Sequence, residues 1–273
     1  MILTFYRVCR SIYRKMIGYP INTFRSVRAL RLQKLIHGVR FEKDNIFFNF
    51  GLGKGLKARR FPHSDLHVLQ QIIQHHEYGF AVEWVASNGL RNHPLRIIDA
   101  GANVGYTSVY FLSAFPNASI LAIEPDIDNY QVLSHNLACC SAANPSLSLH
   151  AALLSCSGIA VTIDRQGGDK KDWSFSVRPA SGVTGIKSVS VGDLLSQTGW
   201  EQVDILKIDI EGSEADVFSE QADLSYLAKT RLLLVEIHDD KADRKKIHQR
   251  LLAHGFSVEE RSETTFAINK ALN

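Results

Sequence analysis

The stretch Ile97-Ile98-Asp99-Ala100-Gly101-Ala102-Asn103-Val104-Gly105 decides the fold of this chain. An apolar run is followed by an acid and then by two glycines with Asn103 midway between them. This order is typical of a buried strand that turns sharply into a helix beneath a nucleotide-like ligand. Gly101 would allow the tight turn, and Gly105 would let the start of the helix press close to the sheet.

A second acid, Glu124, closes the next apolar run, residues 119–123. An acid at the end of the second strand is where ligands that contain adenosine have their ribose hydroxyls held. The ligand is therefore either a dinucleotide or S-adenosylmethionine. Asp99 would repel a pyrophosphate but suits a positively charged amino acid group, whether it meets the ligand directly or orients the loop. Asn103 also stands where a nicotinamide-binding fingerprint needs its middle glycine. Both observations favour S-adenosylmethionine.

The charge of the chain is unevenly distributed. The 273 residues carry a net charge of +3, yet the first 40 residues hold nine Lys or Arg and no acid, which leaves 22 basic against 28 acidic residues in the remainder. We predict a basic helical N-terminal arm with a β/loop extension over 1–60 and one large domain over 61–273. Two interpretations of residues 1–40 stay open: a docked arm with solvated charges, or contact with an anionic membrane surface or another polyanion.

The four cysteines show neither metal-ligand spacing nor a disulfide framework, which is typical of a reducing compartment. No apolar run reaches the roughly 18 residues that a membrane span requires. We therefore expect a cytoplasmic protein, with membrane association through the basic arm left open. The glycine-rich segment 51–55 lacks the second half of a phosphate-binding loop, so a hairpin or bulge is predicted there.

Strand and helix patterns alternate from residue 96 onward, which predicts a doubly wound, mostly parallel sheet with right-handed crossovers. One or two helices are expected over 65–90. The final pair of β segments has no helix between them, which suggests one antiparallel strand at the far edge. The expected strands are 96–101, 119–124, 147–154, 203–210, 231–238, 256–261 and 264–269, with short β segments at 159–164, 173–178 and 186–191; the expected helices are 105–115, 128–140, 214–220 and 241–254.

Charged residues gather at the ends of two later strands. Lys207, Asp209 and Glu211 alternate along the run 203–210 and beyond, so they should share one face. Charges on a strand buried on both faces are costly unless they are paired or functional. By the same alternation Glu236 and His238 share a face at the end of the next strand, and His is a natural proton acceptor near neutral pH.

These motifs together resemble the FkbM-type methyltransferases. The residues that carry the resemblance are the loop Ile98–Gly105, Glu124-Pro125 with Asn129 and Asn136 downstream, the segment Asp204–Glu214 and Glu236-Ile237-His238. The resemblance covers about residues 65–270. It implies a class I methyltransferase fold, which is a Rossmann-like α/β sheet, S-adenosylmethionine as the cofactor, and O-methylation of a hydroxyl on a sugar, glycan, lipid or secondary metabolite.

The resemblance and the strand patterns together assign the site residues. The residues expected to bind the cofactor are Asp99, Gly101, Ala102, Asn103, Gly105, Thr107, Glu124, Pro125, Leu153 and Asp209. The expected catalytic residues are Glu211 or His238 as the base, Asp209 near the donor methyl, and Lys207 balancing charge. No metal is predicted, although Asp209, Glu211, Glu236 and His238 could supply ligands for a divalent ion. A nicotinamide-dependent oxidoreductase and a non-catalytic module that binds S-adenosylmethionine remain as alternatives. The sequence has no Asn/Asp-Pro-Pro-aromatic motif, so nucleic acid is not an expected partner.

Overall fold

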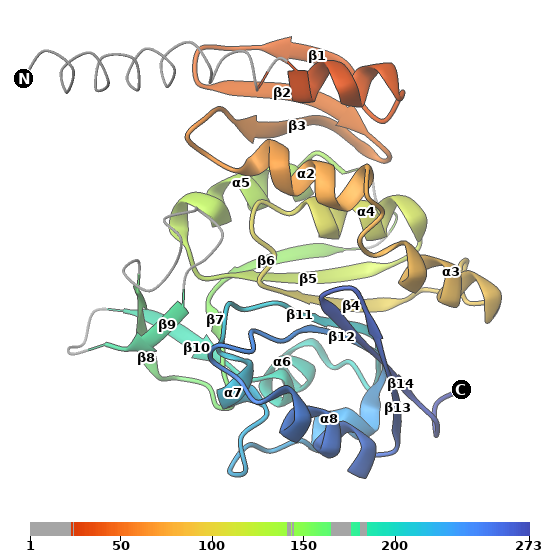
Figure 1. Cartoon of the computed structure of the whole chain (residues 1–273), viewed down its shortest axis with the longest axis vertical. Helices are drawn as coiled ribbons and strands as arrows, with labels where there is room; N and C mark the ends of the chain where they lie inside the picture. Colours follow the sequence, from red (N-terminus) through yellow and green to blue (C-terminus); the bar gives the residue numbers. More distant parts are fainter. Residues whose placement is uncertain (1–22, 24, 141–142, 144, 165–175, 181–184) are drawn as a thin grey trace, which may run out of the picture.

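A seven-stranded sheet forms the centre of the molecule in the computed structural model, which describes residues 23, 25–140, 143, 145–164, 176–180 and 185–273 (Figure 1). Its strands stand in the order β13-β14-β12-β11-β4-β5-β6. Their bounds are β4 Arg96–Ala100, β5 Ser119–Glu124, β6 Ser146–His150, β11 Val203–Ile208, β12 Thr230–Glu236, β13 Phe256–Arg261 and β14 Thr264–Asn269.

Only one of these seven strands runs against the others. The pairs from β12 through β11, β4 and β5 to β6 are all parallel, whereas β14 is antiparallel to both β12 and β13. The strand order reverses direction between β4 and β11, and a crevice at the carboxyl ends of the strands is expected at such a point. The predicted doubly wound sheet with one inserted antiparallel strand is confirmed.

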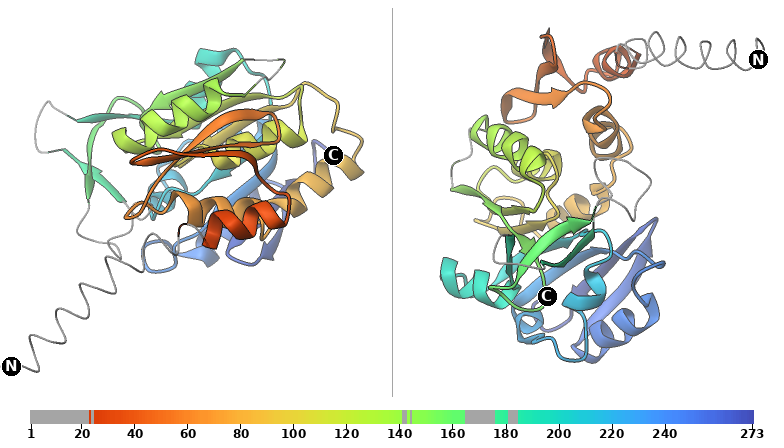
Figure 2. Two further views of the ribbon diagram at one scale, coloured as in Figure 1. Left: turned by 90° about the horizontal axis from the view of Figure 1, so that it is seen from above. Right: turned by 90° about the vertical axis from the view of Figure 1, so that its left-hand side faces the viewer.

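Helices cover both faces of this sheet and enclose two separate apolar cores (Figures 1 and 2). Alternation along β4 sends Ile97 into the first core and Ile98 into the second. The first face carries α2 (Asp65–Ile73), α3 (Gly79–Ser87), α4 (Tyr106–Ala114) and α5 (Ile127–Ala138), and the second carries α6 (Val191–Thr198), α7 (Glu214–Val217), α8 (Arg244–Ala253) and the 3₁₀ helix η1 (Ser225–Lys229).

The N-terminal segment adds a three-stranded antiparallel sheet beyond α2 and α5 (Figure 1). It consists of β1 (His37–Phe41), β2 (Asn45–Phe50) and β3 (Gly53–Arg59), so the glycine-rich segment is a hairpin as predicted. Residues 25–32 are helical, with Val27 buried in the first core and Arg28 exposed. The two interpretations of residues 1–40, a docked arm or contact with a membrane or polyanion, both stay predictions, and residues 1–22 lie outside the described residues. Among the helices that are described, none combines the length and apolar character needed to cross a bilayer.

The structure differs from the sequence prediction around residue 151. The expected strand 147–154 divides into β6 and the short β7 (Ala152–Leu153). β7 leaves the central sheet and pairs in parallel with β10 (Ile186–Val189), in a second sheet completed by β8 (Ala160–Asp164) and β9 (Ser176–Pro179). Part of the expected strand 173–178 lies outside the described residues. Helix α6 was not predicted, although Ser190 caps it by accepting a hydrogen bond from Asp193 N at 3.2 Å.

A buried amide joins the N-terminal sheet to the glycine loop. Asn136 on α5 is fully buried; its Oδ1 accepts from Lys57 N at 2.7 Å, and its Nδ2 donates to Val104 O at 2.8 Å and to Lys57 O at 3.2 Å. Tyr106 Oη also donates to Lys57 O at 2.8 Å. The extension therefore holds the loop from behind.

We expect Asn136→Ala to lower the free energy of unfolding by about 2 kcal/mol, because it removes the hydrogen bonds of a fully buried amide to Lys57 N and Val104 O. Urea denaturation followed by tryptophan fluorescence measures the change. Asn88→Ala is the matched control, since the exposed Asn88 makes one hydrogen bond to Trp84 O. An equal effect in both variants would contradict this account.

Candidate active site

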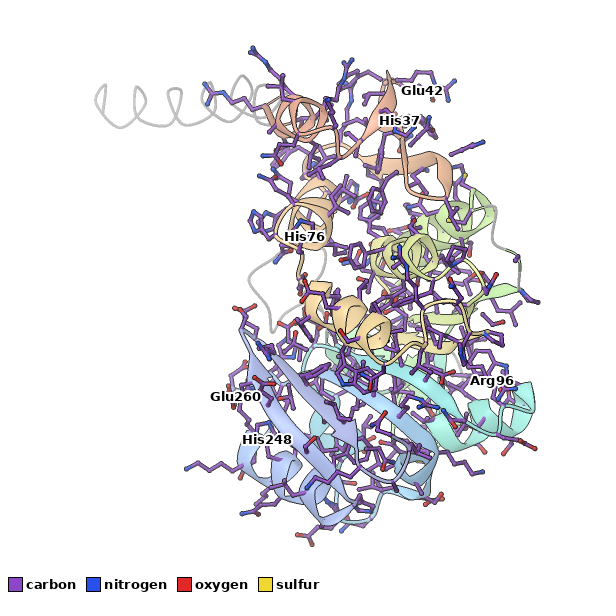
Figure 3. All side chains as sticks on the ribbon, turned by 90° about the vertical axis from the view of Figure 1, so that its right-hand side faces the viewer. His37, Glu42, His76, Arg96, His248 and Glu260 are labelled. Carbon is purple, nitrogen blue, oxygen red and sulfur yellow. The ribbon has the colours of Figure 1, made fainter. Side chains whose placement is uncertain are left out.

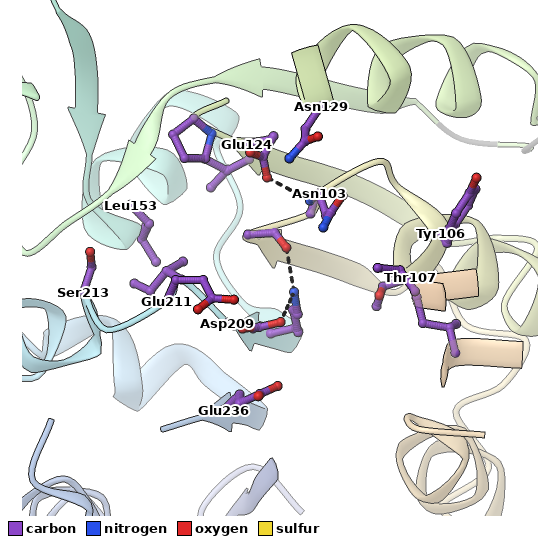
Figure 4. Close-up of a pocket in the computed structure, with 18 of the residues that line it drawn as sticks. Asn103, Tyr106, Thr107, Glu124, Asn129, Leu153, Asp209, Glu211, Ser213 and Glu236 are labelled. Atoms are coloured by element: carbon purple, nitrogen blue, oxygen red, sulfur yellow. Dashed lines mark hydrogen bonds and ion pairs between the residues drawn. The ribbon is translucent and has the colours of Figure 1, made fainter. Parts of the chain in front are cut away.

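A cavity of about 260 Å³ opens at the carboxyl ends of β4, β5, β11 and β12, where the strand order reverses (Figure 4). The glycine loop and the end of β5 form one side of it, and the turn after β11 with the end of β12 forms the other. The connection between α2 and α3 contributes Glu77 and Tyr78. The cavity thus joins an apolar and backbone-lined half to a half rich in carboxylates.

The glycine loop gives the first half of the cavity its shape. Gly101 has a φ of +75°, and the backbone N–H groups of Gly101 and Ala102 both donate to Ile123 O, at 3.0 and 2.9 Å. A Cβ on Gly101 would lie 1.7 Å from Asp209 O. Only glycine therefore lets the turn pass this close to the segment that follows β11.

Glu124 occupies the position that the sequence predicted for ribose binding. Its Oε2 accepts from Asn103 N at 2.9 Å and its Oε1 accepts from Asp126 N at 2.9 Å (Figure 4). Burial raises the pKa of Glu124, the two backbone N–H groups lower it, and the resulting value is about 7. Each oxygen keeps a lone pair for a further donor, which suits a pair of neighbouring hydroxyls.

Lys207 binds two acids and the glycine loop together. Its Nζ donates to Gly101 O at 2.8 Å and lies 3.4 Å from Asp99 Oδ1 and 3.5 Å from Asp209 Oδ2. Burial lowers the pKa of Lys207, but Asp209 and Asp99 outweigh burial and raise it above its ordinary value, so the side chain stays charged. Asp99 also accepts from Ser108 Oγ at 2.6 Å and is fully buried.

Asp99 therefore orients the loop and does not line the cavity. The charge of Asp99 therefore does not distinguish S-adenosylmethionine from a dinucleotide, because Lys207 neutralises the carboxylate and protein atoms enclose it.

His238 stands between carboxylates in the half of the cavity that is rich in carboxylates. Its Nε2 lies 3.3 Å from Glu211 Oε2 and 4.0 Å from Glu236 Oε1, while its Nδ1 lies 3.2 Å from Glu214 Oε1. Burial lowers the pKa of His238, but hydrogen bonds to Glu211 and Glu214 raise it to about 11. The ring is therefore a cation at neutral pH, with a proton on each nitrogen.

Two further acidic side chains, Glu236 and Glu77, line the cavity near Asp209. Asp209, followed by burial, raises the pKa of Glu236 to about 8, and burial with Asp209 raises the pKa of Glu77. Ligand atoms of Asp209, Glu211 and His238 all lie within 4.8 Å of one another, which is close enough to hold a metal ion. The sequence prediction that no metal binds stays a prediction.

The structure brings nearly all of the predicted residues to this cavity. Asp99 and Gly105 do not line it; Gly105 is the N-cap residue of α4, with a φ of +88°, and lies close to Leu133. The predicted residues that do line it are Gly101, Ala102, Asn103, Thr107, Glu124, Pro125, Leu153, Lys207, Asp209, Glu211 and His238.

The segment His75-His76-Glu77 contributes to the cavity from before β4. Its sequence predicts either surface residues or a segment that caps the cofactor. Both histidines are exposed, as Figure 3 shows for His76, whereas Glu77 lines the cavity. The residue after Glu77, Tyr78, is buried, and no pattern in the sequence marks this burial.

Comparison with known proteins agrees with this arrangement. Residues 99–258 match the family model described as the methyltransferase FkbM domain. Methyltransferase sdnD of Sordaria araneosa is 27% identical over 223 residues, which cover 70% of this chain and 82% of that protein. The AMB antimetabolite synthetase AmbE of Pseudomonas aeruginosa is 26% identical over 206 residues, 61% of this chain but only 10% of AmbE. Among solved structures, a putative caffeoyl-CoA O-methyltransferase from Staphylococcus aureus has 13% identity, a TM-score of 0.44, and coverage of 76% of this chain and 93% of that one.

The family match spans more than half of the chain and contains the glycine loop, Glu124 and the charged segments after β11 and β12. It favours methyl transfer over the nicotinamide-dependent alternative and, unlike the charge of Asp99, distinguishes S-adenosylmethionine from a dinucleotide. The chain therefore belongs to the FkbM methyltransferase domain family, and its cofactor is S-adenosylmethionine.

Proposed function

We propose that the protein methylates a hydroxyl oxygen of a sugar, glycan, lipid or secondary metabolite. The observation that supports this best is the group of acidic side chains Asp209, Glu211 and Glu236, which faces the cavity opposite the glycine loop. A hydroxyl is a weak nucleophile, and a positioned base adds roughly 10²–10⁴-fold to the rate of its reaction. The half of the cavity that is rich in carboxylates offers such bases, opposite the half that the glycine loop forms.

The residues of the first half fit the cofactor. Glu124 has lone pairs for the ribose hydroxyls, and its carboxylate is fixed by two backbone N–H groups. Ile123, Pro125 and Leu153 offer apolar surface for adenine. The backbone around Gly101, Ala102 and Asn103 would hold the methionine end, and Thr107 at the start of α4 borders the same space. When bound there, the cofactor supplies an electrophilic methyl group on a sulfonium sulfur.

Methyl transfer is an in-line displacement. Alignment of the acceptor oxygen with the methyl carbon and the sulfur therefore accounts for much of the reduction of the activation barrier. The new O–CH₃ bond forms as the C–S bond breaks, and the electron pair of that bond stays on sulfur. The acceptor also loses its hydroxyl proton. In our proposal Asp209 would lie nearest the methyl group of a bound cofactor, and Lys207, 3.5 Å away, would offset its charge.

Glu211 takes the proton in this scheme. The sequence left Glu211 and His238 as equal candidates for the base. His238 is already protonated between Glu211 and Glu214, so it has no lone pair for the acceptor proton. Its role is to hold the Glu211 carboxylate toward the cavity. Glu211 sits at a positive φ of 56°, on a turn that Lys241 Nζ secures by donating to Glu211 O at 3.0 Å.

We expect Glu211→Gln to reduce the methylation rate by about 100-fold or more, because an amide cannot accept the proton. The affinity for S-adenosylhomocysteine should stay within about threefold, since Glu211 lies outside the half that fits the adenosine. The assay uses S-adenosylmethionine with a labelled methyl group and extracts of neutral glycans, lipids and small metabolites, with products identified by mass spectrometry. Label recovered as a methyl ether supports the proposal.

The same assay includes arms that would contradict the proposal. Label on nitrogen or carbon would disprove O-methylation, and cofactor binding without turnover in any extract would favour the non-catalytic module. Each reaction is run with and without EDTA, because Asp209, Glu211 and His238 lie close enough to share a metal ion. Activity that persists in EDTA is the expected result.

Cofactor affinity should depend on pH through Glu124. Only the ionised carboxylate accepts hydrogen bonds at both oxygens, and its pKa in the folded protein is about 7. The ionised fraction falls as the pH drops below that value, so S-adenosylhomocysteine should bind about tenfold more weakly at pH 6 than at pH 8. Isothermal titration calorimetry measures this. Glu124→Gln should bind weakly at both pH values, and a wild-type affinity that is flat over this range would rule out the assigned role.

A further inference from the structure

Glu214 is a buried acid that the scheme above does not use. It is the first residue of α7 and is fully buried, on the side of His238 away from Glu211. Its Oε1 accepts from Ile210 N at 3.0 Å and lies 3.2 Å from His238 Nδ1, whereas its Oε2 has no hydrogen-bond partner in the part of the chain that the structure describes. A buried carboxylate with one unsatisfied oxygen is costly, and such groups often serve a functional site.

The contacts of Glu214 link the two segments that form the half of the cavity rich in carboxylates. Ile210 belongs to the turn that leaves β11, and His238 follows β12. The turn contains Glu211 and Gly212 at φ values of +56° and +100°, so its conformation needs outside support. Through a single oxygen, Glu214 holds both this backbone and the imidazole ring. The ring in turn contacts Glu211 through its other nitrogen, at 3.3 Å.

We propose that Glu214 is a positioning residue for methyl transfer, whose buried carboxylate anchors the His238 ring so that the ring fixes Glu211 toward the acceptor. Glu214 itself does not line the cavity. The inference rests on the proposed function, because it assigns Glu211 the role of the base. In the series Glu214–His238–Glu211, the cationic ring lies between two carboxylates and contacts both. The ring thereby orients the carboxylate of Glu211 and leaves it unprotonated.

Glu214→Gln is the informative variant. The amide oxygen can still accept from Ile210 N and His238 Nδ1, so the geometry is retained while the charge is lost. Other charged groups around His238 stay in place: Glu211 from the turn after β11, Glu236 at the end of β12 and Asp239 on its own segment. We expect kcat to fall about 10- to 100-fold because the ring holds Glu211 less firmly. The affinity for S-adenosylhomocysteine should stay within about twofold of wild type.

A second readout separates positioning from a merely structural role. Nitrogen-15 NMR of the histidine rings, with the His238 signals assigned by comparison with His238→Gln, should show a ring that stays protonated from pH 6 to 9 in the wild type. In Glu214→Gln the ring should begin to lose its proton within that range, because one of its carboxylate partners is gone. Glu214→Asp should recover part of the rate. Glu220→Gln, an exposed acid beyond the same helix, is the control and should change neither quantity.

The outcomes are distinguishable. An unchanged kcat and an unchanged His238 titration in Glu214→Gln would overturn the positioning role while leaving the proposed function intact. A fall in kcat matched by an equal loss of S-adenosylhomocysteine binding would also overturn it, because the effect would then be on the fold. If wild-type protein methylates no hydroxyl, the proposed function fails first, and the NMR titration still reports whether Glu214 controls His238.

Discussion

Replacing Gly101 with alanine should abolish cofactor binding and lower the free energy of unfolding by about 4 kcal/mol. The left-handed conformation at φ +75° costs an alanine about 1–2 kcal/mol. The larger part of the effect is steric, because the new Cβ would lie 1.7 Å from Asp209 O, a backbone atom that no rotamer change can move. To relieve the clash, the glycine loop must separate from the segment after β11, and the two halves of the cavity would then separate as well.

Gly199 provides the matched control for this experiment. It also has a positive φ, +66°, at the end of α6, but no atom lies within 4 Å of the position a Cβ would take. Gly199→Ala should therefore cost only the conformational term, about 1 kcal/mol, with normal affinity for S-adenosylhomocysteine. Chemical denaturation and calorimetry on both variants decide the matter. Similar losses at the two glycines would show that contact with Asp209 has no special importance.

Lys207→Met should destabilise the protein by about 3–5 kcal/mol, which is the typical result of removing one partner of a buried ion pair. The loss leaves Asp99, which is fully buried, without its cation, and it removes the hydrogen bond to Gly101 O. Lys207 is itself only 3% exposed, so water cannot replace the ammonium group. Methylation should be lost together with stability, because the carbonyl of the loop and Asp209 are both released.

A double variant tests the electrostatic explanation. Adding Asp99→Asn to Lys207→Met removes the unpaired buried charge, and the amide can still bond to Ser108. Much of the lost stability should return, as measured by urea unfolding, whereas activity should not. If the double variant were as unstable as the sum of both single variants, the pairing of Asp99 with Lys207 would not be the source of the effect.

The central sheet could be predicted closely from the sequence because its signals are local. The strand 119–124 and the final pair 256–261 and 264–269 coincide with β5, β13 and β14 residue for residue. The division at Ala151 was not predictable in the same way. Both β6 and β7 are short extended segments, and what separates them is the partner that each finds, β5 for the first and β10 for the second. Long-range pairing of this kind leaves no period in the sequence.

The residues of the candidate site, too, could be predicted only in part from sequence patterns. Alternation along a strand correctly brought Lys207 and Asp209 to one place, but β11 ends at Ile208 and Glu211 reaches the cavity from a turn with positive φ. The charged character of His238 depends on Glu211 and also on Glu214, which approaches from α7 and carries no catalytic signature of its own. The sequence pattern correctly placed Asp99 beside the glycine loop. Lys207, the cation that pairs with it, lies on a strand more than a hundred residues later in the chain.

The amide of Asn136 has a practical consequence for anyone who shortens this protein. The segment recognised as the family domain starts at Asp99, but Val104 within it shares that amide with Lys57, 42 residues upstream of the domain start. A fragment trimmed to residues 99–258 would lose Glu263 from the lining of the cavity, and it would also lack the scaffold behind the glycine loop. Expression vectors and chimeras built on this chain should begin before the first hairpin.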